Sequence, residues 1–365
     1  MSIIIFFVIL LVLVLVHEFG HFFSAKKFGI RVDEFGFGFP PKIFGIKKGE
    51  TEYTFNLLPI GGFVKIFGEN PGEESLNGPD KNRSFVNKAK WKQAIVLLAG
   101  VFANFLLAWV LFSFGLMSGL PTSVSDAPNG ANIEDSHLVI VSVLKDSPAE
   151  KAGLKSGDKI ISLQSGNELI RDISTKDFKS FVMSHGDKEI ELVFLRGKES
   201  EMPMAVKIMP VQNEIGPSIG IAMDQIGIVK LPFFMAFWEG LKLDWSVTKG
   251  TAIGLFTLIK DALAGKGDIS AVTGPVGMVG IVGDASSFGF AYLLSFAALI
   301  SVNLAVINLI PFPALDGGRL LFLLIEKIKG SRLNIKFANT ANVVGFAILI
   351  IFMLIVTYHD VVKLF

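Results

Sequence analysis

The first residues that could do chemistry are two histidines and a glutamate with the spacing His17-Glu18-x-x-His21. On a helix, residues four apart share one face, so both imidazoles can reach a single metal ion. Glu18 then lies beside that face, where its carboxylate can take a proton from a water molecule at the metal. The spacing predicts a hydrolytic metal site with His17 and His21 as ligands and Glu18 as general base.

This cluster sits within a strongly apolar segment. Residues 3–16 are all apolar, and apolar residues resume at Phe19, Phe22 and Phe23. Ionisable groups inside a transmembrane helix are costly and are functional by default. The position therefore favours a buried metal site over the alternative, a charged cluster just beyond the lipid edge.

Two histidines leave a catalytic zinc one ligand short, because such sites use three protein ligands plus water. The chain has no cysteine, and its other histidines are His137, His185 and His359. All three lie on the far side of the membrane in the topology given below. A carboxylate at the end of another span is then required, and Asp316, directly after the uncharged run 285–315, fits best. The alternative role for Asp316 is to cap the next helix.

The composition places much of the chain in lipid. Hydrophobic residues make up 51% and charged residues 18% of the 365 residues, against a usual charged share of about 25%. The net charge of +1 excludes a strongly electrostatic nucleic-acid binder. A bilayer core needs about 20 apolar residues per helix, and four segments provide them: residues 3–23, 93–125, 285–315 and 337–358.

Basic residues beside these spans predict their orientation. The connections 24–92 and 316–336 are rich in Lys and Arg, whereas nothing basic precedes the first span. Both connections should therefore face the cytoplasm, and both termini and residues 126–284 should face outside. The same lack of a basic N-terminal flank, with no small-residue cleavage site, argues against a secretory signal peptide.

The external region contains a module that resembles a PDZ domain in the circularly permuted form of bacterial proteases. The resemblance rests on the stretch SPAEKAGLKSGDKI, a short helix and a Gly-Asp turn between two strands. Such domains bind extended peptides by adding a strand to a sheet edge. The predicted elements are strands at 138–144, 159–164, 190–196 and 204–210, and a helix near 175–184.

The segment between this module and the third span has two parts. Residues 231–263 mix aromatic and charged side chains, including Trp238 and Trp245, which suggests a pair of helices lying at the membrane interface. Residues 265–283 are rich in glycine and are expected to form a flexible or tightly packed entry into the third span.

The third span carries two polar residues that need partners, Asn303 and Asn308. Hydrogen bonding between helices is one role for each of them. Pro311 and Pro313 then break the helix just before Asp316. Irregular backbone at membrane depth is tolerated where it lines a protein cavity, so a cavity is expected here.

Taken together, H-E-x-x-H in the first span, the PDZ-like module after the second, and N-x-x-P-x-P-x-L-D-G-G from Asn308 to Gly318 resemble the site-2 protease family. The match is to the bacterial RseP-type branch of these intramembrane zinc metalloproteases, and it covers nearly the whole chain in order. The resemblance implies a multi-pass α-helical membrane protein with about four transmembrane helices, a membrane-re-entrant β-loop and an inserted α+β PDZ domain. The implied domains are 1–118 with the β-loop at about 30–68, 122–212 for the PDZ domain, 213–284 for the interfacial helices and linker, and 285–365 for the last two spans.

The resemblance also implies residue roles. One zinc ion per chain would be held by His17, His21 and Asp316, with Glu18 as general base and acid. Asn308 would help to hold the substrate near the metal.

Three further residues are substrate-binding candidates. Asn303, five residues before Asn308 in the same span, is one of them. Gly36 and Gly38 match the family's glycine pair in the β-loop, where an extended substrate strand could approach the backbone closely. An ordinary cytoplasmic hairpin is the alternative for this loop.

The chain departs from the family pattern in two ways. Residues 126–212 have room for one PDZ domain, whereas many relatives carry two, and Val101 stands where relatives usually have proline. Asn104 matches a family asparagine, although a packing role is equally open.

The function expected from the resemblance is zinc-dependent cleavage of transmembrane segments of single-span membrane proteins, such as anti-sigma factors or remnant signal peptides. The protein would lie in the bacterial plasma membrane, with the PDZ domain outside and the active site near the cytoplasmic side. Its partners would be these substrates, an extended peptide at the PDZ domain and the lipid bilayer, but no nucleic acid. The alternative is a non-catalytic PDZ scaffold with a structural metal site. A transporter would show internal repeats, and the sequence has none that we detect.

Overall fold

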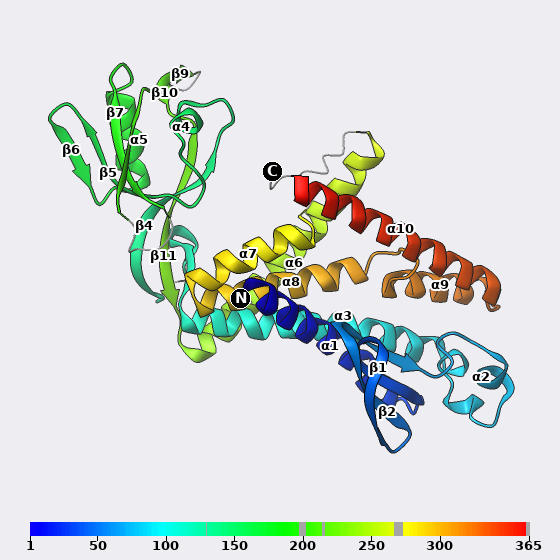
Figure 1. Cartoon of the computed structure of the whole chain (residues 1–365). Helices are drawn as coiled ribbons and strands as arrows, with labels where there is room; N and C mark the ends of the chain where they lie inside the picture. Colours follow the sequence, from blue (N-terminus) through cyan, green and yellow to red (C-terminus); the bar gives the residue numbers. More distant parts are fainter. Residues whose placement is uncertain (129, 197–201, 214–215, 266–272, 363–365) are drawn as a thin grey trace. The chain divides into compact units, whose positions relative to one another are not determined.

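The computed structural model describes residues 1–128, 130–196, 202–213, 216–265 and 273–362 (Figure 1). The chain forms two compact units. One consists of Met1–Phe114 and Phe237–Phe365, and the other of Gly115–Ala236.

The first unit is built around long apolar helices. Four helices in the described part of the chain are long and apolar enough to cross a membrane: α1 (Ser2–Lys27), α3 (Lys90–Ser118), α8 (Phe290–Asn308) and α10 (Ile335–Val362). They correspond to the four expected spans. The third is shorter than predicted, because Gly289 adopts a φ of +117° and separates α8 from the preceding helix.

The segment expected to form a pair of interfacial helices forms one continuous helix instead, α6 (Phe233–Leu263). No proline interrupts it, and one face packs on α3 and α8. Leu243 and Val247 contact a buried cluster formed by Ala108 and Phe112 of α3 and Ala298 and Val302 of α8. Trp109 donates its indole N–H to the carbonyl oxygen of Phe237 at 2.8 Å.

The glycine-rich segment expected as a linker is partly helical. Helix α7 (Pro275–Phe288) begins with proline in its first turn, a position that needs no N–H donor. The backbone N–H groups of Gly274 and Gly277 donate to the buried carboxylate of Asp360 in α10, at 3.2 and 2.8 Å. An acceptor from another helix thus satisfies the start of α7. Residues 266–272 of the predicted linker lie outside the described residues.

Asp244 of α6 is fully buried, and neither carboxylate oxygen has a hydrogen-bond partner among the described residues. Burial raises the pKa of Asp244 to about 7. Where an aspartate has a raised pKa in the folded state, the free energy of unfolding is highest below the ordinary pKa. It falls as the pH rises from the ordinary pKa to the raised one. A pKa raised from its ordinary value to about 7 corresponds to a loss of order 4 kcal/mol.

We therefore expect Asp244→Asn to be more heat-stable than the wild type at pH 8 and about equal to it at about pH 3, below the ordinary pKa of the carboxyl group. The test is the thermal midpoint of the detergent-solubilised protein as a function of pH. Asp261→Asn, on the same helix, is the matched control. Parallel pH profiles for the wild type and Asp244→Asn would contradict the expectation.

Two antiparallel strands, β1 (Val32–Lys48) and β2 (Thr51–Ile66), form the hairpin expected at about 30–68. At its base, Ile30, Val32 and Ile66 pack with Ala25 of α1 and Val96 of α3. Both strands contact α1, and most of these contacts are made by β2. The hairpin also exposes several large apolar side chains: Phe39, Ile43, Phe44, Ile46, Leu57 and Leu58. The hairpin is followed by the short helix α2 (Glu73–Asn77).

The second unit is a mixed α+β structure around one large sheet. The strand order is β3 (Leu120–Ser123), β11 (Ile221–Lys230), β4 (Asn132–Val143), β5 (Lys159–Ser165), β7 (Ile190–Leu195) and β8 (Met204–Ile208), with β6 (Glu168–Arg171) paired to β5. Helix α5 (Thr175–Ser184) packs Phe178, Phe181 and Val182 onto this sheet. The remaining elements are α4 (Pro148–Lys151), β9 (Val211–Asn213) and β10 (Gly216–Ser218).

The second unit extends beyond the predicted boundary at residue 212. β11 pairs with both β3 and β4, so the sheet needs the residues up to Lys230. The helix at 175–184 and the strands near 138, 159, 190 and 204 are where the sequence predicted them.

Candidate metal centre

The three predicted metal ligands come together in the first unit. His17 and His21 lie one turn apart on α1, and their Nε2 atoms are 3.1 Å from each other. Asp316, the first residue of α9 (Asp316–Lys329), places Oδ2 at 3.0 Å from Nε2 of His17 and 3.2 Å from Nε2 of His21. Both histidines are buried.

Helix α3 orients both imidazoles. The Nδ1–H of His21 donates to the carbonyl oxygen of Val96 at 2.8 Å, so Nε2 of this ring is the unprotonated nitrogen. The side-chain amide of Asn104 lies 3.4 Å from Nδ1 of His17, and Oδ1 of the fully buried Asn104 has no partner among the described residues. Amide oxygen and nitrogen are interchangeable in assignment. With the amide reversed, Oδ1 accepts from His17 Nδ1–H, and both rings present Nε2.

This donor set fits a zinc ion. With both rings protonated on Nδ1, two nitrogen lone pairs and a carboxylate oxygen converge with no proton between them, which calls for a cation. Ligands at about 2.0–2.2 Å from a tetrahedral zinc lie roughly 3.3–3.5 Å apart. The observed separations of 3.0 to 3.2 Å are close to this. His17, His21 and Asp316 would hold the ion, leaving one position open for chemistry.

Two glycines allow α1 and α3 to pack closely and leave space for the imidazoles between the helices. A Cβ added at Gly100 of α3 would lie 2.4 Å from Nε2 of His21, and one added at Gly20 of α1 would lie 2.3 Å from the carbonyl oxygen of Ala99. Any side chain at Gly100 would therefore enter the metal site. The sequence analysis assigned no role to either glycine, although Gly20 lies inside the H-E-x-x-H motif itself.

The turn between α8 and α9 positions Asp316. Ala314 in this turn has a φ of +77°, and its N–H donates to Oδ1 of Asn342 in α10 at 3.2 Å. Gly345 of α10 lets the same turn pack closely, since a Cβ there would lie 2.6 Å from the carbonyl oxygen of Pro313. Asp316 is the first helical residue and Leu315 occupies the cap, so the carboxylate is available for the metal site.

The ligands line a cavity of about 300 Å³ together with Glu18 and Asn308. Glu18 is half-buried and interacts with the backbone N–H of Val64 in β2. The lining residues that the sequence did not single out include Phe63 and Val64 of β2, Glu69 of the following loop, and Arg319 of α9. The cavity thus combines a metal site, a carboxylate beside it and one edge of a β-hairpin.

The other substrate-binding candidates lie elsewhere. Asn303 accepts a hydrogen bond from Thr251 of α6 at 3.3 Å and is not among the residues that line the cavity. Its position agrees with the alternative role of hydrogen bonding between helices. Gly36 and Gly38 of β1 are also absent from the lining; Gly36 faces the ring of Phe63, and Gly38, with a φ of +77°, lies against Leu58.

Comparison with known proteins gives a consistent result. The family model described as peptidase family M50 matches residues 5–352. The chain belongs to peptidase family M50. It is similar to the regulator of sigma-W protease RasP of Bacillus subtilis, 30% identical over 100% of this chain and 99% of that protein. It is also similar to the zinc metalloprotease RasP of Oceanobacillus iheyensis, 30% identical over 97% of each chain, and to a Clostridium perfringens protein named as a candidate zinc metalloprotease, 35% identical over 96% of this chain and 95% of that one.

Membership of this family makes the protein a zinc metalloprotease of the site-2 protease type. The converging histidines and aspartate supply a ligand set that suits the zinc of such an enzyme. The four apolar helices agree with a membrane-embedded M50 peptidase.

We expect Asn104→Leu to weaken zinc binding by about 10–100-fold, because the residue that fixes a ligand histidine contributes that much. The measurement is zinc affinity in competition with a fluorescent chelator. Asn104→Asp, which keeps an acceptor for His17 Nδ1–H, should bind zinc within a few fold of the wild type. Ser301→Ala, which removes only the hydrogen bond to the backbone oxygen of Asn104, is the packing control. Equal zinc affinity in Asn104→Leu and the wild type would show that Asn104 only packs.

Proposed function

We propose that this M50 peptidase hydrolyses peptide bonds within the membrane-spanning segments of single-span membrane proteins. One observation carries the proposal: His17, Glu18 and His21 belong to α1, one of the four helices apolar enough to span a bilayer. Catalytic residues on a membrane-spanning helix would act on a substrate peptide bond that also lies within the membrane.

In this mechanism Glu18 is the proton carrier. Its carboxylate takes a proton from the attacking water as the oxygen adds to the scissile carbonyl carbon, and then gives it to the leaving nitrogen as the C–N bond breaks. Bound zinc supplies the Lewis acidity that polarises the carbonyl and acidifies the water. The half-buried setting of Glu18 beside Asp316 keeps these groups at one reaction centre.

The substrate would bind in extended form. A transmembrane helix hides its carbonyl groups in internal hydrogen bonds, so it has to unwind before water can attack. Phe63 and Val64 of β2 line the cavity, and β2 would accept the unwound segment as a further strand. Asn308, which also lines the cavity, would hold a substrate backbone group near the metal. β2 thereby takes the place that the sequence analysis gave to Gly36 and Gly38.

The second unit would act as a PDZ domain that receives the part of the substrate outside the membrane. A groove of about 320 Å³ runs between α5 and the strands β10 and β11, and its walls include Phe178, Val182, Ile219 and Met223. An apolar groove beside a sheet suits an extended peptide with large apolar side chains. On the orientation predicted from the basic connections, this unit faces outside and the metal site lies toward the cytoplasm.

The Bacillus subtilis relative is named a regulator of sigma-W protease. By analogy, the substrates of this chain would include single-span regulators of sigma factors, and remnant signal peptides offer the same kind of apolar segment. The exposed apolar end of the β1–β2 hairpin, with Ile43 and Phe44, would enter the bilayer as the re-entrant loop, and the enzyme would reside in the plasma membrane.

The test is cleavage of a panel of tagged single-span segments, both anti-sigma factors and remnant signal peptides, by the purified full chain in lipid nanodiscs. We expect at least one segment to be cut inside its apolar stretch, cleavage to stop when zinc is chelated, and activity to return when zinc is added. Cleavage confined to the loops outside the apolar stretch would contradict the proposal. Zinc and peptide binding without any cleavage across the panel would favour the non-catalytic scaffold.

A further inference from the structure

Arg319 is the one cationic side chain among the described residues that line the catalytic cavity. It lies three residues after Asp316 on α9, and residues three apart lie on the same side of a helix. Its charge interacts with that of Glu18. A guanidinium is always protonated and carries five N–H donors. The residue therefore brings a permanent positive charge and several N–H donors to the cavity that Glu18 and Asp316 also line.

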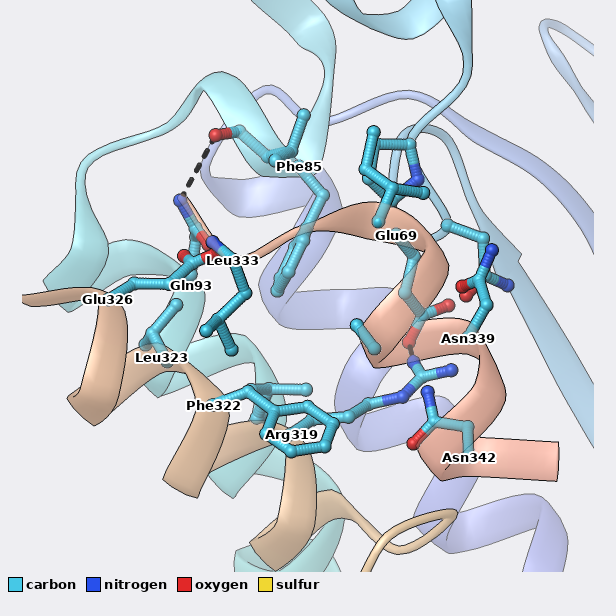
Figure 2. A pocket seen from close by; sticks show the side chains of 16 residues that line it. Glu69, Phe85, Gln93, Arg319, Phe322, Leu323, Glu326, Leu333, Asn339 and Asn342 are labelled. Carbon is cyan, nitrogen blue, oxygen red and sulfur yellow. Dashed lines mark hydrogen bonds and ion pairs between the residues drawn. The ribbon is translucent and has the colours of Figure 1, made fainter. Parts of the chain in front are cut away.

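Glu69 holds this side chain in place. The two form an ion pair between α9 and the loop after β2, and Figure 2 shows the guanidinium of Arg319 directed at Glu69. The exposed fractions are only 29% for the Arg319 side chain and 18% for that of Glu69. Among the described residues, Glu69 is the ion-pair partner of Arg319, and a single carboxylate cannot occupy all five donors.

The charges of the site explain why a cation belongs here. Glu18, Asp316 and Glu69 are three carboxylates, and a zinc ion with Arg319 would balance them. During hydrolysis a further negative charge develops on the carbonyl oxygen of the substrate. Donors fixed in advance near that oxygen, in a site shielded from water, stabilise the transition state more than the bound substrate.

We propose that Arg319 is a further catalytic residue, which donates a hydrogen bond to the scissile carbonyl oxygen, and that Glu69 is its positioning residue. As water adds to the carbonyl carbon, the electron pair of the C=O bond moves onto this oxygen beside Arg319. The pair returns to restore the carbonyl when the C–N bond breaks, and the proton that Glu18 took goes to the nitrogen. This inference rests on the proposed peptidase function.

A purely structural role is the competing explanation. Glu69 and Arg319 also line the neighbouring cavity of about 110 Å³ shown in Figure 2, together with Phe322, Asn339 and Asn342. Both residues also line a third cavity, of about 510 Å³. The ion pair is therefore part of the walls of several cavities, and on this explanation its loss only loosens those walls. The experiment must separate the loss of a donor from the loss of a wall.

The variants are Arg319→Gln, Arg319→Lys and Glu69→Gln in the full chain in nanodiscs. Glu326→Gln is the matched control, because Glu326 forms a comparable ion pair from α9 to Lys90 and lines the neighbouring cavity but not the catalytic one. Four quantities are measured: zinc content, kcat, KM for the best-cleaved segment of the panel, and the affinity for two probes. The probes are N-phosphoryl-leucyl-leucinamide, with a tetrahedral anionic group that resembles the oxyanion, and leucyl-leucinamide, without that group.

We expect Arg319→Gln to keep its zinc and its KM while kcat falls by about 10²–10³-fold, the usual cost of one oxyanion donor. Its affinity for the phosphoryl probe should fall by at least tenfold, with that for leucyl-leucinamide unchanged. Arg319→Lys should recover part of kcat, Glu69→Gln should lose less than Arg319→Gln, and Glu326→Gln should match the wild type.

The inference is overturned if Arg319→Gln retains kcat, or if its affinity for both probes falls equally. It is also overturned if Glu326→Gln loses as much activity as Arg319→Gln. Failure of the proposed function gives a different result, because the wild type itself would then cut no segment of the panel.

Discussion

Glu18→Gln should keep its zinc, and its cleavage rate should fall by about 10²–10⁴-fold, the range attributed to a positioned general base. The substitution changes one oxygen for an NH₂ group and leaves the shape of the side chain intact. Glu18 lines the cavity without belonging to the converging set of His17, His21 and Asp316. An amide cannot accept the proton of the attacking water, so binding should survive and turnover should not.

The measurement is the cleavage rate for the best-cleaved single-span segment, with zinc content determined on the same preparation by mass spectrometry. Glu239→Gln is the matched control, because Glu239 pairs with Lys242 on α6 and is not among the residues lining the catalytic cavity. It should cleave like the wild type. A Glu18→Gln protein that contains zinc and still cleaves at the wild-type rate would remove Glu18 from the mechanism.

The convergence of His17, His21 and Asp316 could be predicted from sequence because two physical constraints act directly on the histidines. The i, i+4 spacing of His17 and His21 places both rings on one side of a helix, and their cost in an apolar segment requires a function. Asp316 followed from the number of ligands that zinc needs and from the order of the spans. The observed convergence within 3.2 Å involves residues about 300 positions apart, which the topology brings together.

Helix geometry separates the two asparagines of α8 that the sequence offered as substrate-binding candidates. Asn303 and Asn308 are five residues apart, and at 3.6 residues per turn this places them about 140° from each other around the axis. One cavity on one side of α8 can therefore hold only one of them. Asn308 lines the cavity, and Asn303 bonds to Thr251 of α6.

The remaining differences come from tertiary contacts that leave no local pattern. Glu69 lies in the loop after β2, and Arg319 lies near the start of α9. Only the tertiary fold brings the two side chains together. β11 escaped prediction because its pairing with β4 is irregular near Ala222 and near Ile226, and a bulge disrupts the alternation of apolar residues that reveals a strand. α6 resembled an interfacial segment because its exposed face carries Trp238 and Trp245, although its other face packs on α3 and α8.

Asp316→Ala should lower zinc affinity by more than about 100-fold, because even the loss of a contact that supports a ligand costs 10–100-fold. The variant leaves two imidazoles whose Nε2 atoms face each other at 3.1 Å, with no carboxylate to complete the site. Zinc bound by two neutral nitrogens alone would also lose the charge balance that Asp316 provides. We therefore expect the purified variant to contain little zinc and to cleave no segment of the panel.

A second measurement separates lost binding from lost folding. A ligand that binds only the folded state raises its stability by RT ln(1 + [L]/Kd), so added zinc should raise the thermal midpoint of the metal-free wild type and leave that of Asp316→Ala unchanged. Asp33→Ala, which removes the carboxylate paired with Arg31 at 2.8 Å in the same unit, is the control and should still respond to zinc. A normal response in Asp316→Ala would mean that another residue supplies the third ligand. Full loss in Glu18→Gln with its zinc retained, and loss of both zinc and activity in Asp316→Ala, would together assign the base and the ligand to different carboxylates of one cavity.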